Sequence, residues 1–173
     1  IENINKKNNN RIEVKCYVDN DNKKCGKMFM NKIVLDSKTF LETYKNDECF
    51  LFNSIASSIK ERKKVTEFYL DKGFDFQSLI HPDLDLNYVT VGKGVFLQEN
   101  ALVQANSKIS DYVIISSNSC IAHDSSVGKF TFIGGAVYVC GRVEIGENER
   151  NSQRSFHLPT YFLKHVQKKI SFF

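Results

Sequence analysis

A branched apolar residue recurs at every sixth position in the second half of the chain. The register is unbroken through ten residues: Val91, Leu97, Val103, Ile109, Ile115, Ile121, Val127, Ile133, Val139 and Ile145. A period of six matches neither the helix repeat of 3.6 residues nor the plain alternation of a strand. The pattern favours a solenoid of short parallel strands, three to a coil, over a β-sandwich with fortuitous spacing.

In such a solenoid each sixth residue points inward and stacks on its equivalent one coil away. The residue four places after each of the first nine is small or β-branched and is expected at a corner of a triangular section. Glycines that directly follow an inward residue are expected to ease tight corners: Gly92, Gly128, Gly134 and Gly146. We expect residues 84–148 to form a parallel β-helix with all ten sixth-position residues inside.

The hexapeptides of residues 91–148 resemble the left-handed β-helix of bacterial hexapeptide-repeat acyltransferases. The preceding stretch GFDFQSLIHPDL, residues 73–84, resembles the sialic-acid O-acetyltransferases and the bacillosamine-pathway UDP-amino-sugar N-acetyltransferases. The resemblance implies acetyl transfer from acetyl-CoA, without a metal, to an amino or hydroxyl group of a nucleotide-activated sugar for cell-surface glycans. It also implies a homotrimer with parallel axes, for which Val95, Ile114 and Tyr138 would supply apolar outer surface.

Four segments are expected along the chain. Residues 1–11 are polar and asparagine-rich, which is typical of disorder. Residues 12–80 resemble the family's small α/β nucleotide-sugar-binding subdomain, as a truncated Rossmann-like unit whose first βα unit and glycine-rich turn are absent. Residues 81–148 form the left-handed β-helix. Residues 149–173 form a basic, aromatic tail that is expected to be a short helix or a disordered extension.

The α/β segment shows the patterns of two strands and two helices. Apolar residues alternate in IEVKCYV, which predicts a half-buried strand, and CFLFNSI predicts a second one. SKTFLETYKN predicts a helix capped by Ser37, with Phe40, Leu41 and Tyr44 on its buried face.

The second predicted helix starts at a Ser58/Glu61 capping box and stops at Gly73. We expect Val65, Phe68 and Tyr69 to be buried on it.

Asp19 and Asn20 end the first predicted strand at the point where family members carry FLDD. The resemblance implies that they meet the base of the nucleotide, with Asp19 as the first carboxylate and Asn20 in place of the second. A polar turn that bonds its own backbone explains the same residues equally well.

His123 lies two residues after the inward Ile121 and should face outward near a corner. The resemblance places the catalytic histidine here, followed by an acidic residue that matches Asp124. A neutral imidazole can take the proton of an attacking amine or hydroxyl, and a carboxylate can orient the ring. A surface histidine with an acidic neighbour is the alternative.

Gly141 lies one full coil after His123 and matches a glycine whose backbone N–H lies near the thioester carbonyl, although a corner glycine explains it too. The chain departs from the family at Ser116, a substrate-binding position where bacillosamine-pathway members carry asparagine. It also has Phe132 where they often carry a second histidine. These departures leave open an impaired paralogue that acts as a structural or binding trimer.

The net positive charge of the chain is concentrated in its C-terminal tail. Residues 149–173 carry five basic residues and one acidic residue, which equals the net charge of +4 of the whole chain. The body therefore offers no electrostatic case for nucleic acid. In the tail, Phe162, Val166, Ile170 and Phe173 share one helical face. We expect this helix to cap the end of the solenoid. The alternatives are a basic helix that binds a membrane or nucleic acid, and a disordered extension.

The remaining composition narrows the class of protein. Hydrophobic residues make up 42% of the chain, but no apolar run is long enough for a membrane span. Five widely spaced cysteines without a CxxC pair suggest reduced thiols and a cytoplasmic protein. A zinc enzyme on the same solenoid would need three convergent histidines, whereas residues 85–148 contain only His123.

Overall fold

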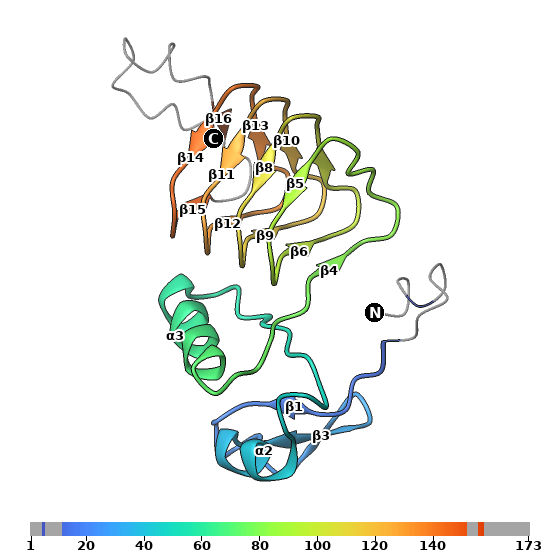
Figure 1. Cartoon of the computed structure of the whole chain (residues 1–173), viewed down its shortest axis with the longest axis vertical. Coiled ribbons are helices and arrows are strands. Elements are labelled where there is room, and N and C mark those ends of the chain that lie inside the picture. The colour runs from blue at the N-terminus through green and yellow to red at the C-terminus, as the bar shows by residue number, and fades with distance from the viewer. Residues whose placement is uncertain (1–4, 6–11, 152–155, 158–173) are drawn as a thin grey trace.

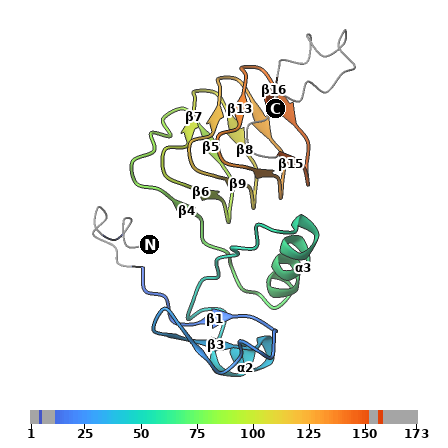
Figure 2. The same cartoon turned by 180° about the vertical axis from the view of Figure 1, so that it is seen from behind.

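A computed structural model describes residue 5, residues 12–151 and residues 156–157. Figures 1 and 2 show the solenoid at one end of the molecule and a small mixed sheet at the other, with helix α3 (Ile59–Leu70) between them. The tail beyond residue 157 and most of the lead segment lie outside the described residues, so the predictions made for them stay predictions.

The solenoid is built from two-residue strands in three parallel sheets, which we call faces 1, 2 and 3. Face 1 contains β4 (Leu79–Ile80), β6 (Phe96–Leu97), β9 (Ile114–Ile115), β12 (Phe132–Ile133) and β15 (Arg150–Asn151). Face 2 contains β7 (Leu102–Val103), β10 (Cys120–Ile121), β13 (Tyr138–Val139) and β16 (Phe156–His157). Face 3 contains β5 (Thr90–Val91), β8 (Lys108–Ile109), β11 (Ser126–Val127) and β14 (Glu144–Ile145). The predicted β-helix is confirmed.

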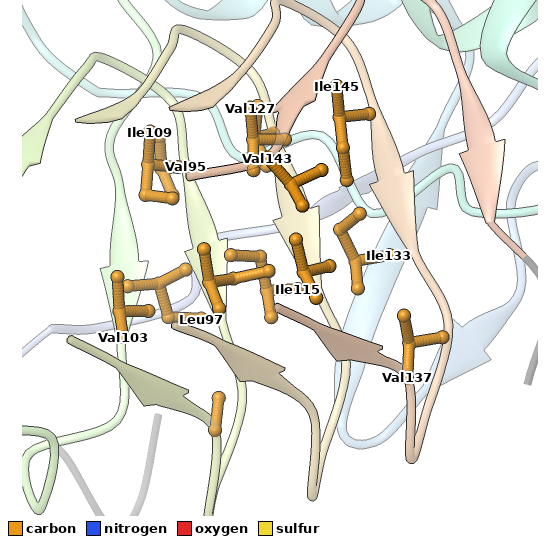
Figure 3. Packing of buried hydrophobic residues seen from close by; sticks show 14 residues of the cluster. Val95, Leu97, Val103, Ile109, Ile115, Val127, Ile133, Val137, Val143 and Ile145 are labelled. Carbon is orange, nitrogen blue, oxygen red and sulfur yellow. The ribbon is translucent and has the colours of Figure 1, made fainter. Parts of the chain in front are cut away.

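The core consists of the predicted column of sixth-position residues together with five small corner residues, Val95, Ala101, Val113, Val137 and Val143 (Figure 3). Nine of the sixth-position residues are buried, and Val91, in the first coil, is half-buried against the same cluster. Each residue pairs in register with its equivalent 18 places away, as Ile121 does with Val139. Full burial of one such side chain contributes about 1.5–3 kcal/mol, so the column as a whole stabilises the solenoid substantially.

The corners are closed by buried small residues, as predicted. Four of them carry hydroxyl groups that donate to a backbone carbonyl of the next coil at 2.7–3.0 Å: Ser107, Ser119, Ser125 and Thr131. Since each hydroxyl has its partner, these polar groups are buried without an unsatisfied donor.

The prediction that glycines directly after the inward residues form the tight corners is wrong. The chain turns with positive φ three residues after each inward residue, for example at Asn106 (62°) and Asn118 (60°), rather than at the glycines directly after it. Gly92 and Gly128 are needed for close approach of two coils instead. A Cβ atom at Gly92 would lie 2.7 Å from the backbone nitrogen of Asp111, and one at Gly128 would lie 2.6 Å from that of Glu147.

The solenoid is longer than predicted at both ends. It begins at β4, which pairs with β6, and it continues past residue 148 through β15 and β16, which pair with β12 and β13. The predicted tail helix is therefore wrong for residues 150–151 and 156–157, while the rest of the tail lies outside the described residues. Backbone pairing with the previous coil holds the register even though Asn151 replaces an apolar inward residue. The Nδ2 atom of Asn151 is buried without a hydrogen-bond partner within the described part of the chain.

The N-terminal subdomain has a three-stranded sheet of order β1-β3-β2. Strand β1 (Tyr17–Val18) is parallel to β3 (Lys32–Leu35), and β2 (Met28–Phe29) is antiparallel to it. Both predicted strands are shorter than expected: IEVKCYV contributes only β1, and CFLFNSI only a bridge between Leu51 and Phe76. The Rossmann-like assignment stays a prediction.

The two helices form where the sequence indicated, with differences at single residues. Helix α2 (Ser37–Thr43) is capped by Asp36, whose carboxylate accepts from the Thr39 N–H, rather than by Ser37. In α3 the Ser58 cap is confirmed, because its hydroxyl accepts from the Glu61 N–H at 3.2 Å. Phe68 was predicted to be buried but is 43% exposed.

Arg62 and Thr66 are buried on α3 instead of Phe68, because Arg62 faces the solenoid. Its Nη2 atom donates to the carbonyl of Phe130, and in return Nη1 of Arg150 donates to the carbonyl of Ala56 at 2.6 Å. Burial, together with the charge of Arg150, lowers the pKa of Arg62 to about 10. Arg62 therefore stays charged at neutral pH, and the two arginines tie the subdomain to face 1.

Aromatic rings complete this contact between the subdomain and the solenoid. Tyr112 and Phe130 stack with ring centroids 4.8 Å apart at the corner between faces 3 and 1, and Phe76 meets Tyr112 edge-on. Ile114 on face 1 is only 3% exposed, and Val95 is fully buried, so the prediction that these two supply outer apolar surface is wrong. Tyr138 on face 2 is 41% exposed, as that prediction required.

Candidate active site

The His123–Asp124 pair lies at the corner between faces 2 and 3, which we call the reactive corner. Strand β10 ends at Ile121, whose side chain is fully buried, and the buried Ala122 continues the ladder by donating its N–H to Val139. His123 then points outward, and Asp124 turns the chain with a φ of 58°. The position of the histidine thus follows from the sixfold register.

The backbone of this corner is held by the coils on either side. The N–H of His123 donates to Oε1 of Gln104 at 3.1 Å, and its carbonyl accepts from the N–H of Arg142 at 3.0 Å. The N–H of Asp124 donates to the carbonyl of Ala105. These bonds fix the point from which the imidazole projects.

The imidazole is oriented by a carboxylate. Nδ1 of His123 lies 2.8 Å from Oδ2 of Asp124, whose other oxygen accepts from Nδ2 of Asn106 at 3.2 Å. The hydrogen bonds from His123 and Asn106 lower the pKa of Asp124 below its usual value. An ionised carboxylate can only accept, so the Nδ1 atom carries the proton and Nε2 of the neutral ring is free to act as a base.

The backbone of Gly141 packs against the His123 ring. A Cβ atom at this position would lie 2.7 Å from Nε2 and 2.8 Å from Cε1 of His123, closer than real side chains approach. The backbone of the next coil therefore lies directly beside the free nitrogen. The His123 side chain is 55% exposed and that of Asp124 is 41% exposed, so the corner is open to an incoming substrate.

The structure brings together three of the six predicted site residues. His123, Asp124 and Gly141 meet at the reactive corner, whereas Ser116 follows β9 at the corner between faces 1 and 2. Asp19 and Asn20 directly follow β1. Figures 1 and 2 show β1 beyond α3 from the solenoid.

The contacts of that turn are local. Oδ1 of Asp19 accepts from the N–H of Asp21 and its Oδ2 pairs with Lys24 at 2.6 Å, while Oδ1 of Asn20 accepts from the N–H of Ser37. A polar turn accounts for these bonds, and a substrate role for Asp19, Asn20 and Ser116 remains a prediction.

Sequence reasoning missed three residues of the reactive corner. Asn106 and Arg142 lie one coil before and after Asp124, and Nε of Arg142 is 4.0 Å from its carboxylate. Gln104, one coil before Ala122, supports the His123 backbone. The 18-residue spacing was the signal that could have found all three, because residues one coil apart are stacked neighbours.

Solved structures with the same architecture were found by comparison. The acetyltransferase domain of PglB from Neisseria gonorrhoeae FA1090 is 18% identical, with a TM-score of 0.68 over 83% of this chain and 78% of that one. A His-to-Asn variant of perosamine N-acetyltransferase from Caulobacter crescentus, in complex with CoA and GDP-perosamine, is 20% identical, with a TM-score of 0.67 over 77% and 72%.

The fold is that of the sugar acetyltransferases. WeeI from Acinetobacter baumannii AYE shares it as well, at 20% identity and a TM-score of 0.68 over 76% of this chain and 60% of that one. No protein-family model matches the sequence.

Within the described ranges, no three or more His, Cys, Asp and Glu side chains come together in a way that could hold a metal ion. None of the helices in the described part of the chain is long and apolar enough to cross a membrane. All five cysteines are free thiols.

Proposed function

We propose that the chain transfers the acetyl group of acetyl-CoA to an amino or hydroxyl group of a nucleotide-activated sugar. The observation that carries the proposal is the reactive corner, where Nε2 of His123 is free and lies beside the backbone of Gly141. Similar folds support it, since the perosamine N-acetyltransferase variant is in complex with CoA and GDP-perosamine, and the PglB domain is in complex with acetyl coenzyme A.

The chemistry is a direct transfer. The acceptor nitrogen or oxygen attacks the carbonyl carbon of the thioester while Nε2 of His123 takes its proton. The carbon–sulfur bond then breaks, the acetyl group stays on the sugar, and the thiolate of CoA recovers the proton from His123. Asp124 holds the ring and stabilises its charged form, and the N–H of Gly141 stabilises the negative charge on the thioester oxygen.

The acceptor would lie between neighbouring subunits of a homotrimer. Face 2 supports this assembly, since it borders the reactive corner and presents the exposed Leu102 and Tyr138, 49% and 41% exposed. In the trimer, Ser116 would approach the acceptor, and Asp19 and Asn20 would bind its nucleotide. We place the protein in the cytoplasm, where free thiols persist.

The competing function is a structural or binding trimer without catalysis. Acetyl-CoA titrated into the protein in a calorimeter separates the two, because only the enzyme needs the donor. Binding, followed by release of CoA in the presence of UDP- or GDP-linked amino sugars, is the expected result. No heat of binding and no CoA release with any of these acceptors would refute the proposed function.

A further inference from the structure

Tyr88 has a large aromatic side chain that almost wholly faces solvent. It is 85% exposed, the highest value among the large apolar and aromatic side chains of the described residues. It also adopts a positive φ of 62°, which is unfavourable for a bulky side chain. A residue with both features adds little to the stability of the fold.

Tyr88 belongs to the reactive corner. Its carbonyl accepts from the N–H of Asn106 at 2.8 Å, and Nδ2 of Asn106 donates to Asp124 at 3.2 Å. Tyr88 is therefore two coils before Asp124 on the same corner. Coils stack at the spacing of neighbouring strands, so the two backbones are about 10 Å apart. That distance is spanned by one sugar ring with its substituents.

Two other aromatic residues with positive φ, Tyr112 and Phe130, have a structural role and serve as a comparison for Tyr88. Tyr112 and Phe130 stack on each other at the corner between faces 3 and 1, where Phe76 and Arg62 of the subdomain contact them. Within the described residues, Tyr88 has no aromatic partner of this kind. Packing explains the first two rings and leaves Tyr88 unexplained.

We propose that the ring of Tyr88 is a stacking platform for the nucleotide-sugar acceptor. This inference rests on the proposed function. The thioester is assigned to the Gly141 side of His123, so the acceptor must approach from the opposite side along the solenoid, where Tyr88 lies. A planar ring favours a flat apolar face, which both a sugar ring and a nucleobase offer. Tyr88 would set acceptor affinity and take no part in proton transfer.

The turn position itself supplies the best test variant. Asparagine tolerates positive φ and occupies the equivalent corner positions 100, 106, 118 and 148. Tyr88→Asn should therefore keep or raise the melting temperature while it removes the ring. The KM for the acceptor should rise roughly 3- to 10-fold, with kcat and the KM for acetyl-CoA unchanged. Tyr88→Phe, which keeps the ring, should retain the KM of the wild type.

The assay uses the full chain and the UDP- or GDP-linked amino sugar that the wild type acetylates best. Phe68→Ala is the matched control, since it removes an exposed aromatic ring from α3, away from the reactive corner. Inhibition by the free nucleoside diphosphate separates the two sources of stacking. If the inhibition constant rises in Tyr88→Asn by the same factor as the acceptor KM, the ring stacks on the nucleobase. If the inhibition constant is unchanged, the ring stacks on the sugar.

Three results would overturn the inference. The acceptor KM could stay the same in Tyr88→Asn, the KM for acetyl-CoA could rise instead, or Tyr88→Phe could be as impaired as Tyr88→Asn. In each case the wild type still transfers acetyl groups, so the proposed function stands. A wild type that acetylates no nucleotide sugar would overturn both.

Discussion

His123 is held by residues from three successive coils. Gln104 in the preceding coil accepts from its backbone N–H, Asp124 pairs with its ring, and the backbone of Gly141 in the following coil lies against the ring. The pair His123–Asp124 could be predicted because two adjacent residues and the sixfold register define it. The oxyanion role of Gly141 was implied by a resemblance and stays a prediction, whereas the contact between its backbone and the His123 ring is a feature that the structure adds.

That contact predicts the effect of adding one methyl group. Gly141→Ala should lower kcat at least tenfold, because the new Cβ atom would push the imidazole away and break the hydrogen bond between its Nδ1 atom and Asp124. Steady-state kinetics with acetyl-CoA measure it. Gly146→Ala is the control, since its Cβ atom would meet nothing closer than 3.8 Å and kcat should stay as in the wild type. Equal kcat for both variants would argue against the contact.

Asp124→Asn should separate charge from shape, because asparagine suits the positive φ of this position. We expect kcat to fall about 10²-fold or more, since an amide no longer dictates which ring nitrogen carries the proton.

The lowered pKa of Asp124 also predicts a pH effect on stability. The ionised carboxylate stabilises the fold above its ordinary pKa of about 3.9, and this stabilisation is lost as pH falls through the lowered value.

Melting temperatures of the wild type and Asp124→Asn from pH 7 down to about pH 2 test this sign. The wild type should lose its advantage only in the acid range. A difference between the two that grows as the pH falls would contradict the assignment.

At the scale of elements, the strands were predictable and the turns were not. The inward column needs only one apolar residue in six, and ten consecutive matches left little doubt about register. The turns use positive φ at residues as varied as Asn118, Phe130 and Arg142, so composition gave no signal for them. Helix α2 shows the same limit, because Asp36 and Ser37 are both good caps and only the backbone decides between them.

The corner hydroxyls make a quantitative prediction about these elements. Thr131 donates to the carbonyl of Gly146 at 2.8 Å and accepts from the N–H of Glu149 at 3.1 Å. Thr131→Val keeps the shape and leaves both backbone groups without this partner, which should cost about 1–3 kcal/mol of unfolding free energy. Thr90→Val, on the exposed side of β5, should cost much less in the same denaturant titration. Equal costs would contradict the role given to the corner hydroxyls.

At the scale of the whole molecule, the contact between subdomain and solenoid could not be predicted. Arg62 reaches the carbonyl of Phe130 across 68 residues of sequence, and nothing in the pattern of α3 marks a buried arginine. The outer surface was misjudged for the same reason, since the buried Ile114 belongs to face 1, and Phe96 and Arg150 of this face contact the subdomain. Face 2 is left as the exposed apolar face, which directs the trimer prediction there.

Tyr138→Lys should therefore weaken assembly, because it places a charge on the apolar side of face 2. Light scattering at micromolar concentration should give the mass of a trimer for the wild type and a smaller mass for this variant. Lys108→Ala on face 3 is the control and should assemble like the wild type. A monomeric wild type would contradict the assembly.

The central claim, that His123 is the general base of an acetyl transfer, is tested most directly by His123→Ala. Acetyl transfer to the preferred nucleotide sugar should fall about 10²- to 10⁴-fold, with acetyl-CoA affinity and assembly as in the wild type. Glu144→Ala, at an exposed position of β14 on face 3, should retain full activity. If His123→Ala transfers acetyl groups as fast as the wild type, the histidine is not the base and the account of the reactive corner is wrong.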